Sequence, residues 1–239
     1  MSVLGRVARS LHPGIRKVHA QVARYAADWE KANGVALGGA GPLWAVLGDS
    51  TAQGIGAPSW EEGYVGQLFR ALNDGSGMPW RVVNLSRSGA RAADVLDRQL
   101  PAMEALSTPP DLVTCAIGAN DIVGRTPLPL LQDQLRQIID RLPEGAIIAT
   151  LPQGLSGART EAANRVVREK APAAGLVVAD VWARTGPPWR GKFAADGFHP
   201  GALGYADWAA AFAAVLDLAL PSRFPDPGQP PHRLDSQES

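Results

Sequence analysis

The chain has 239 residues, 46% hydrophobic and 19% charged, which supplies enough apolar material for a sizeable core and excludes a disordered chain. Its 23 basic residues balance its 23 acidic ones, so charge gives no reason to expect nucleic acid or an anionic membrane as a partner. The single cysteine, Cys115, excludes an internal disulfide and a cysteine zinc cluster. No apolar run approaches the ~20 residues of a membrane helix, and no secretory signal is evident, so we expect a cytoplasmic protein without a transmembrane segment.

Residues 1–42 are expected to form a helical extension that ends in a loop. Apolar residues recur at three- or four-residue steps over residues 3–33, with an interruption at Pro13 and basic residues between them. This pattern is typical of an amphipathic helix that packs on the core. A basic helix resting on a membrane, or acting as a lid, is the alternative. Residues 34–42 read GVALGGAGP, a composition that predicts a loop.

From Leu43 onward, short apolar runs alternate with helical patterns over residues 43–220, which we interpret as one domain. Continuous runs of Val, Ile and Leu suit strands that are buried on both faces of a parallel sheet. Five β–α repeats predict an α/β fold with three layers, in which helices cover both faces of a five-stranded parallel sheet. The Pro-rich and polar tail, residues 221–239, is expected to be disordered. The expected strands are 43–47, 81–85, 111–117, 146–151 and 175–181, and the expected helices are 62–73, 91–104, 127–141, 158–171 and 203–219.

Polar residues and glycines follow the first three strands. Ser50 comes directly after the first strand, Gly89 after the second and Asn120 after the third. Each has a simpler interpretation by itself, because Ser also caps helices and Gly and Asn also form turns. The carboxyl ends of parallel strands share one edge of the sheet, however, and ligands bind in the crevice beyond that edge.

A carboxylate and an imidazole stand three residues apart near the end of the domain, at Asp196 and His199. An Asp can hold one ring nitrogen of such a His and leave the other free for a nucleophile. Together with the residues after the strands, the pair supplies a nucleophile, a general base, an orienting group and oxyanion donors. This combination predicts acyl transfer.

The four blocks resemble those of the SGNH (GDSL-like) hydrolase superfamily. They read Gly48-Asp49-Ser50, Asn84 to Gly89, Gly118 to Asp121 and Asp196 to His199, in the family's order. Thr51 stands where the literal GDSL text has Leu. The resemblance spans residues 43 to about 219 and implies a flavodoxin-like SGNH fold.

By this resemblance, Ser50 is the nucleophile, His199 its general base and Asp196 the group that orients His199. The backbone N–H groups of Ser50 and Gly89 and the Asn120 side chain would form the oxyanion hole. No cofactor and no metal ion are implied.

The resemblance implies ester hydrolysis, or transfer of a short or medium acyl chain to or from a sugar hydroxyl. The Arg-rich, Ala-rich composition suggests an actinobacterial or other GC-rich source. Within the superfamily, the chain resembles actinobacterial sugar acyltransferases, such as those that move octanoyl onto glucosylglycerate. The expected partners are therefore a small acyl ester and a sugar acceptor. A non-catalytic carbohydrate- or lipid-binding module on the same fold is the alternative.

Five further side chains are candidates for substrate binding, although each could equally be a packing or solvated loop residue. Three of the seven tryptophans fall on segments that are expected to wall the crevice, and aromatic walls suit a sugar face or an acyl chain. Two arginines near the same edge could bind a carboxylate with two hydrogen bonds. These candidates are Trp60, Trp182, Trp189, Arg87 and Arg125.

Overall fold

The computed structural model of the chain describes residues 12–155 and 157–218. The expected disordered tail and the part of the expected helix that precedes residue 12 lie outside the described residues. Within the described ranges, no helix is long and apolar enough to cross a bilayer.

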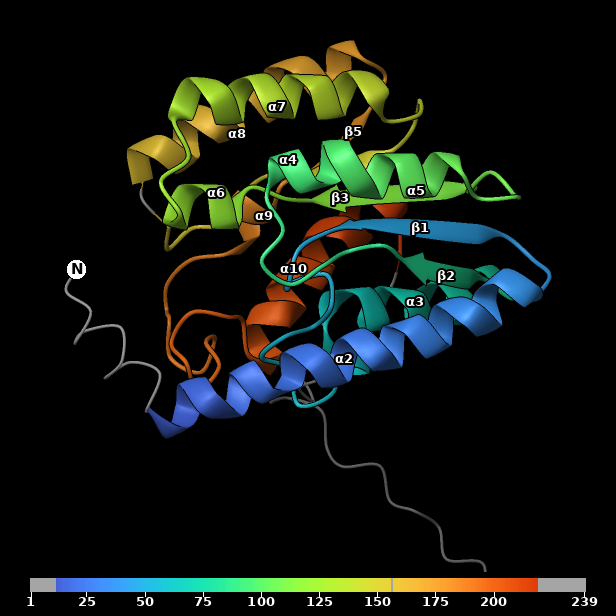
Figure 1. Cartoon of the computed structure of the whole chain (residues 1–239), viewed down its shortest axis with the longest axis horizontal. Helices are drawn as coiled ribbons and strands as arrows, with labels where there is room; N and C mark the ends of the chain where they lie inside the picture. Colours follow the sequence, from blue (N-terminus) through green and yellow to red (C-terminus); the bar gives the residue numbers. More distant parts are fainter. Residues whose placement is uncertain (1–11, 156, 219–239) are drawn as a thin grey trace, which may run out of the picture.

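A five-stranded parallel sheet forms the centre of the molecule, in the order β2-β1-β3-β4-β5 (Figure 1). This is the order of flavodoxin-like sheets. Pairing of Val46 with both Asn84 and Thr114 fixes β1 between β2 and β3. The expected α/β fold is confirmed, although β4 and β5 are shorter than the apolar runs suggested. The strands are β1 (Leu43–Gly48), β2 (Arg81–Asn84), β3 (Leu112–Ala116), β4 (Ile147–Ala149) and β5 (Val177–Ala179).

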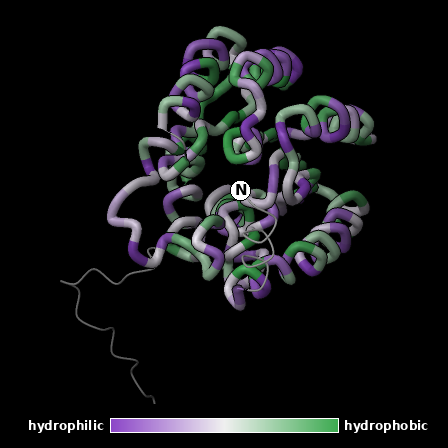
Figure 2. Tube along the Cα trace, turned by 60° about the vertical axis from the view of Figure 1, so that its left-hand side comes forward, coloured by the Kyte–Doolittle hydropathy of each residue, from purple (hydrophilic) through white to green (hydrophobic). Residues whose placement is uncertain are grey.

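Helices cover both faces of the sheet, and Figure 2 shows the most hydrophobic stretches toward the middle of the molecule. One face packs under α4 (Ala92–Asp94), α5 (Leu100–Glu104), α7 (Leu128–Arg141) and α8 (Gly157–Ala173). The other packs under α3 (Tyr64–Ser76) and α10 (Ala202–Leu216). Aromatic rings are concentrated on this second face, where Tyr64 stacks on Phe212 with ring centroids 5.1 Å apart.

Short elements that the sequence pattern did not reveal lie at the carboxyl ends of the strands. They are α6 (Ala119–Val123), α9 (Val181–Arg184) and a 3-10 turn at Trp60–Glu62. The expected helix 91–104 is also interrupted, by a π-helical turn at Val95–Gln99 between α4 and α5. All are too short to produce a recognisable hydrophobic period.

The N-terminal helix α2 (Pro13–Gly38) packs along the edge strand β2. It therefore belongs to the folded core, as the first of the two interpretations predicted. The prediction of a loop at 34–42 is wrong for its first half, because the helix continues through Gly34 to Gly38. Burial explains the extension: Ala36 packs against Leu43 and Val83, and its carbonyl oxygen accepts a hydrogen bond from Arg81.

Candidate active site

Ser50 lies in the turn that follows β1, at the centre of the sheet's carboxyl edge. Gly48 permits the turn because a Cβ atom there would lie 2.7 Å from the Ala116 carbonyl oxygen on the neighbouring strand. Asp49 then accepts hydrogen bonds from the backbone N–H and the hydroxyl of Thr51, at 2.9 and 2.8 Å. These contacts hold the turn on both sides of Ser50.

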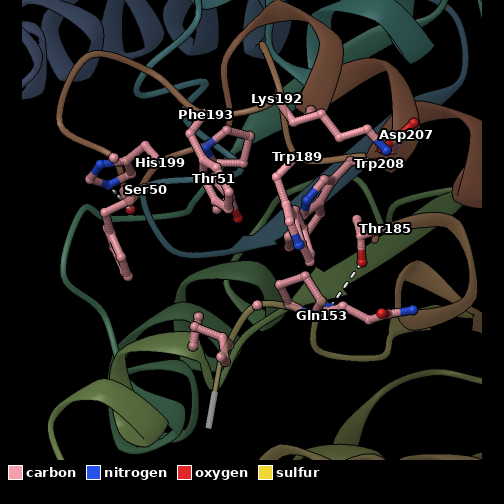
Figure 3. A pocket seen from close by; sticks show the side chains of 18 of the residues that line it. Ser50, Thr51, Gln153, Thr185, Trp189, Lys192, Phe193, His199, Asp207 and Trp208 are labelled. Atoms are coloured by element: carbon pink, nitrogen blue, oxygen red, sulfur yellow. Dashed lines mark hydrogen bonds and ion pairs between the residues drawn. The ribbon is translucent and has the colours of Figure 1, made fainter. Parts of the chain in front are cut away.

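The structure brings Ser50, His199 and Asp196 into one hydrogen-bonded series. Ser50 Oγ lies 3.0 Å from His199 Nε2 (Figure 3), and His199 Nδ1 lies 2.6 Å from Asp196 Oδ2. Ser50 is separated from His199 by 149 positions in the sequence, so the sheet and α10 are what bring them together. The two ring nitrogens thus face a hydroxyl and a carboxylate, the arrangement that lets an imidazole remove the hydroxyl proton.

The Asp196 carboxylate is held in its ionised form. Burial acts to raise its pKa, but hydrogen bonds from the His199 side chain and from the backbone N–H groups of Phe198 and His199 outweigh burial and leave the pKa below its usual value. An ionised Asp196 fixes the proton on His199 Nδ1 and leaves Nε2 as the base.

The three expected oxyanion donors differ in their surroundings. Within the described part of the chain, neither the Ser50 nor the Gly89 backbone N–H has a hydrogen-bond acceptor. Gly89 adopts a φ of +79°, which favours glycine at this turn. Asn120 lies in the first turn of α6, where its Nδ2 donates to the Ala90 carbonyl oxygen at 3.0 Å. Nδ2 also makes a longer contact of 3.5 Å with Asp49 Oδ2. These bonds fix the side chain beside Ser50, with which it lines one pocket, and an oxyanion would replace the weaker of the two acceptors.

Two buried glutamines support these turns, and no local sequence pattern marked either one. Gln99 comes from the π-helical turn, where its amide pairs with both the N–H and the C=O of Gly48, each at 2.8 Å. Gln53 accepts from the Ser88 backbone N–H at 3.0 Å and so supports the turn that contains Gly89. Both glutamines bond to backbone groups that are distant in sequence, and hydrophobic periodicity gives no indication of such contacts.

Two buried carboxylates join the blocks to each other. Asp121 accepts from the Ala92 backbone N–H at 2.9 Å and from the Thr126 hydroxyl at 2.9 Å. Burial raises the pKa of Asp121 against the opposing effect of these hydrogen bonds. It also raises the pKa of Asp49, against the opposing effect of the hydrogen bonds from Thr51. Both carboxyl groups hold neighbouring backbone in place, and neither bonds Ser50 or His199.

A pocket with a volume of about 120 Å³ opens beside Ser50 and His199. Aromatic side chains form much of its wall, and Trp189 and Phe193 stack with centroids 5.6 Å apart. Figure 3 shows Ser50 and His199 at one end and a charged pair, Lys192 and Asp207, at the other, where their charged atoms lie 2.7 Å apart. Gln153 and Thr185 also line the pocket, and the Thr185 hydroxyl accepts from the Gln153 backbone N–H at 2.9 Å. The pocket thus joins a nucleophile, apolar walls and a polar far end.

Of the five expected substrate-binding residues, only Trp189 lines this pocket. Trp60 packs edge-to-face on Trp29 of α2, with centroids 4.5 Å apart, and lines a different groove beside α3. Trp182 contributes its carbonyl oxygen, which accepts from Gln153 Nε2 at 2.9 Å, but its side chain lies outside the lining. Arg87 and Arg125 are exposed and also lie outside it.

Most of the pocket's other lining side chains were missed because they come from segments with no strand-end motif, whereas Phe198 lies within the block from Asp196 to His199. Phe193, Phe198 and Lys192 belong to the irregular segment before α10, and Trp208 belongs to α10 itself. Trp208 is buried and also forms part of the pocket wall. Among the described residues, no three His, Cys, Asp or Glu side chains are grouped so as to hold a metal ion.

Comparison with known proteins places the chain in a family. The model of the GDSL-like Lipase/Acylhydrolase family matches residues 46–206. Among solved structures, TesA is 27% identical over 73% of this chain and 97% of its own, with a TM-score of 0.62. LAE5, an alpha/beta hydrolase enzyme from the metagenome of Lake Arreo, is 25% identical over 76% of this chain and 97% of its own, with a TM-score of 0.59.

A third solved structure shares the fold at lower identity. Axe2, an acetylxylan esterase from Geobacillus stearothermophilus, is 22% identical over 77% of this chain and 99% of its own, with a TM-score of 0.59. No match was found among curated proteins.

The chain belongs to the GDSL-like lipase/acylhydrolase family, since the family's model spans most of it and the described fold agrees. Within that family it is a serine esterase.

Proposed function

We propose that this protein cleaves short acyl groups from sugar hydroxyls, with Ser50, His199 and Asp196 as its catalytic residues. The observation that carries the proposal is the hydrogen-bonded series from Ser50 Oγ through His199 to Asp196, at 3.0 and 2.6 Å, which opens onto a pocket with aromatic walls. A non-catalytic binding module does not need this series, so family membership and geometry both favour the enzyme.

The proposed reaction proceeds through an acyl-enzyme. Ser50 Oγ attacks the ester carbonyl carbon while His199 Nε2 takes its proton. The carbonyl oxygen becomes an oxyanion, which the N–H groups of Ser50 and Gly89 and the Asn120 amide stabilise. The carbon–oxygen bond to the alcohol then breaks, and the alcohol leaves with the proton from His199. Water repeats the sequence on the acyl-enzyme and releases the acid and free Ser50.

The pocket's size supports a short acyl group. An apolar cavity of about 150 Å³ holds a ligand the size of benzene, and this pocket of about 120 Å³ is somewhat smaller. Acetyl to butyryl groups fit such a space in full, whereas an octanoyl chain would extend beyond it.

The polar far end of the pocket supports a sugar as the alcohol. Lys192 Nζ contacts Asp207 Oδ2 at 2.7 Å and donates to the Gly186 carbonyl oxygen at 3.0 Å, which leaves one of its three N–H donors for a ligand. Trp189, which is 37% exposed, lines the same pocket. Sugars offer hydroxyls that both donate and accept, together with C–H faces that pack on aromatic rings. Axe2, an acetylxylan esterase, has a similar fold.

The test compares two esters of one acid, an O-acetylated hexose and p-nitrophenyl acetate. We expect Lys192→Met to raise KM for the sugar ester about tenfold, equivalent to ~1.4 kcal/mol, and to leave KM for p-nitrophenyl acetate within about twofold. The control is Lys170→Met, which removes an ion pair of similar length, 2.6 Å to Asp140, from the surface between α7 and α8.

Each outcome has a defined meaning. Turnover that survives Ser50→Ala unchanged would show that the catalytic assignment is wrong. An equal rise in KM for both esters would refute the sugar subsite and leave the serine chemistry intact. Faster cleavage of p-nitrophenyl octanoate than of the acetate would contradict the short acyl group. Formation of an acylated sugar from added free sugar, detected by mass spectrometry, would show transfer instead of hydrolysis.

A further inference from the structure

Helix α2 is hydrogen-bonded to the turn that continues from the Ser50 loop. Gln21 makes two of these bonds: its Oε1 accepts from the Gly56 N–H at 2.8 Å, and its Nε2 donates to the Ala57 carbonyl oxygen at 3.0 Å. The Tyr25 hydroxyl donates to the same carbonyl oxygen at 3.0 Å. Tyr25 is 1% exposed, so its bond is shielded from water, whereas Gln21 and its two bonds are partly buried.

The same turn contacts both of the residues that must meet for proton transfer. Toward the nucleophile, the Ile55 N–H donates to the Ser50 carbonyl oxygen at 3.0 Å. Toward the base, Gly56 adopts a φ of +100°, and a Cβ atom there would lie 2.9 Å from His199 Cβ and 2.5 Å from the Pro200 carbonyl oxygen. Because the turn touches the backbone of the His199 segment, a displacement of the turn changes the position of the imidazole relative to Ser50.

The first turn of α2 reaches the other side of the same segment. Gly14 lies so close to the residue before Asp196 that a Cβ atom there would be 2.1 Å from the Ala195 carbonyl oxygen. Figure 1 shows the N-terminal turns of α2 beside the loop that leads to α10. A small apolar cluster of Val18, Tyr25 and Ile55 fills the space between the helix and the turn.

These contacts are additional to what the chain shares with its relatives. The family match begins at residue 46, after α2 has ended at Gly38. TesA is covered over 97% of its length by only 73% of this chain. Helix α2 therefore lies outside the part of the chain that the family's model matches, although it contacts the catalytic loops within that part.

We propose that α2 is a clamp for the active site, in which Gln21 and Tyr25 are positioning residues that hold the Gly54–Ala57 turn and thereby fix His199 against Ser50. The proposal rests on the proposed function, because it assigns His199 as the base. Gln21 and Tyr25 do not line the pocket and act only through the turn.

The test removes the Gln21 hydrogen bonds without opening a cavity, by Gln21→Met. The matched control is Asn33→Leu on the same helix, because the Asn33 amide also makes a pair of bonds with backbone, to the Asn84 carbonyl oxygen at 2.9 Å and N–H at 2.8 Å on β2. We expect both variants to lose similar thermal stability. Only Gln21→Met should lower kcat, by about tenfold, equivalent to ~1.4 kcal/mol, with KM changed by less than about twofold.

A second readout does not depend on turnover. In the wild type we expect a low-field proton resonance from the 2.6 Å hydrogen bond between His199 Nδ1 and Asp196. Gln21→Met should broaden or shift it, whereas Asn33→Leu should not. If Gln21→Met fails to fold, Tyr25→Phe removes a single bond of the clamp and should show a smaller change of the same kind.

Three results would overturn the proposal: an unchanged kcat and resonance in Gln21→Met, equal losses of kcat in Gln21→Met and Asn33→Leu, or a change in KM alone. Failure of the proposed function is distinguishable, because then Ser50→Ala would retain wild-type turnover. The resonance would still report whether α2 positions His199.

Discussion

At the scale of the residue, the Asp196 carboxylate organises the base. It accepts from His199 Nδ1 at 2.6 Å and from the backbone N–H groups of Phe198 and His199 at 3.0 and 3.1 Å. Bonds of this kind stabilise the ionised form and are stronger than those between neutral groups. The same contacts that lower the pKa of Asp196 therefore also stabilise the fold and select the His199 tautomer.

Asp196→Asn should separate these two effects. We expect kcat to fall by about 10²–10⁴, because an amide no longer holds the proton on His199 Nδ1. The free energy of unfolding should fall by about 2 kcal/mol at pH 7, the size of a charge-assisted hydrogen bond. Kinetics and urea denaturation of the two proteins measure both quantities.

The pH dependence has a definite sign. The pKa of Asp196 is lower in the folded protein than its ordinary value of 3.8, so its contribution to stability is fully present above that value and is lost as pH falls through the folded-state pKa. The stability difference between wild type and Asp196→Asn should therefore be constant above about pH 5 and shrink below it. A difference that grows toward acid pH would contradict the assignment.

At the scale of the element, the π-helical turn between α4 and α5 carries a structural function. It directs the Gln99 amide onto both backbone groups of Gly48, at the end of the strand that presents Ser50. Irregular helical turns of this kind often occur at functional sites, because they redirect one side chain that a regular helix would place elsewhere.

Gln99→Met should leave both Gly48 groups buried without partners. We expect a loss of about 2–4 kcal/mol in the free energy of unfolding, because each unsatisfied buried group costs about 1–3 kcal/mol. The comparison variant is Gln132→Met, which removes a single bond of 3.2 Å between α7 and α8 and should cost less than about 1 kcal/mol. Equal losses in the two variants would show that Gln99 makes no special contribution.

The sequence predicted features that depend on neighbouring residues, and it did not predict those that depend on residues far apart in the chain. Strands that are buried on both faces leave a local apolar run. Ser50 and Asn120 stand in short motifs at strand ends, and His199 stands in a short motif before the last helix. The strands and these residues could therefore be identified from the chain alone. Gln99 and Gln21 bond to backbone far away in sequence, and neither lies in a motif. Trp60 and Trp189 looked equivalent in sequence. The structure distinguishes them, because Trp60 packs on Trp29 whereas Trp189 lines the pocket.

At the scale of the whole molecule, the fold converts separation in sequence into proximity. The parallel sheet with order β2-β1-β3-β4-β5 brings the ends of β1, β2 and β3 together, and α10 and the segment before it deliver His199 to the same edge. Helix α2 packs along the edge strand β2 and lies outside the residues that the family's model matches. The first half of the glycine-rich stretch at 34–42 is helical because tertiary burial of Ala36 outweighs the low helix propensity of glycine.

The central claim is that Ser50 carries the acyl group between its two transfers. Mixing the protein with p-nitrophenyl acetate, quenching with acid within the first turnover and mapping the peptides by mass spectrometry measures this directly. We predict one acetyl group on the peptide that contains Ser50 and none on that peptide from Ser50→Ala, while His199→Ala should form the adduct far more slowly. An acetyl group that is located on another residue, or turnover with no adduct on Ser50 at any quench time, would contradict the account.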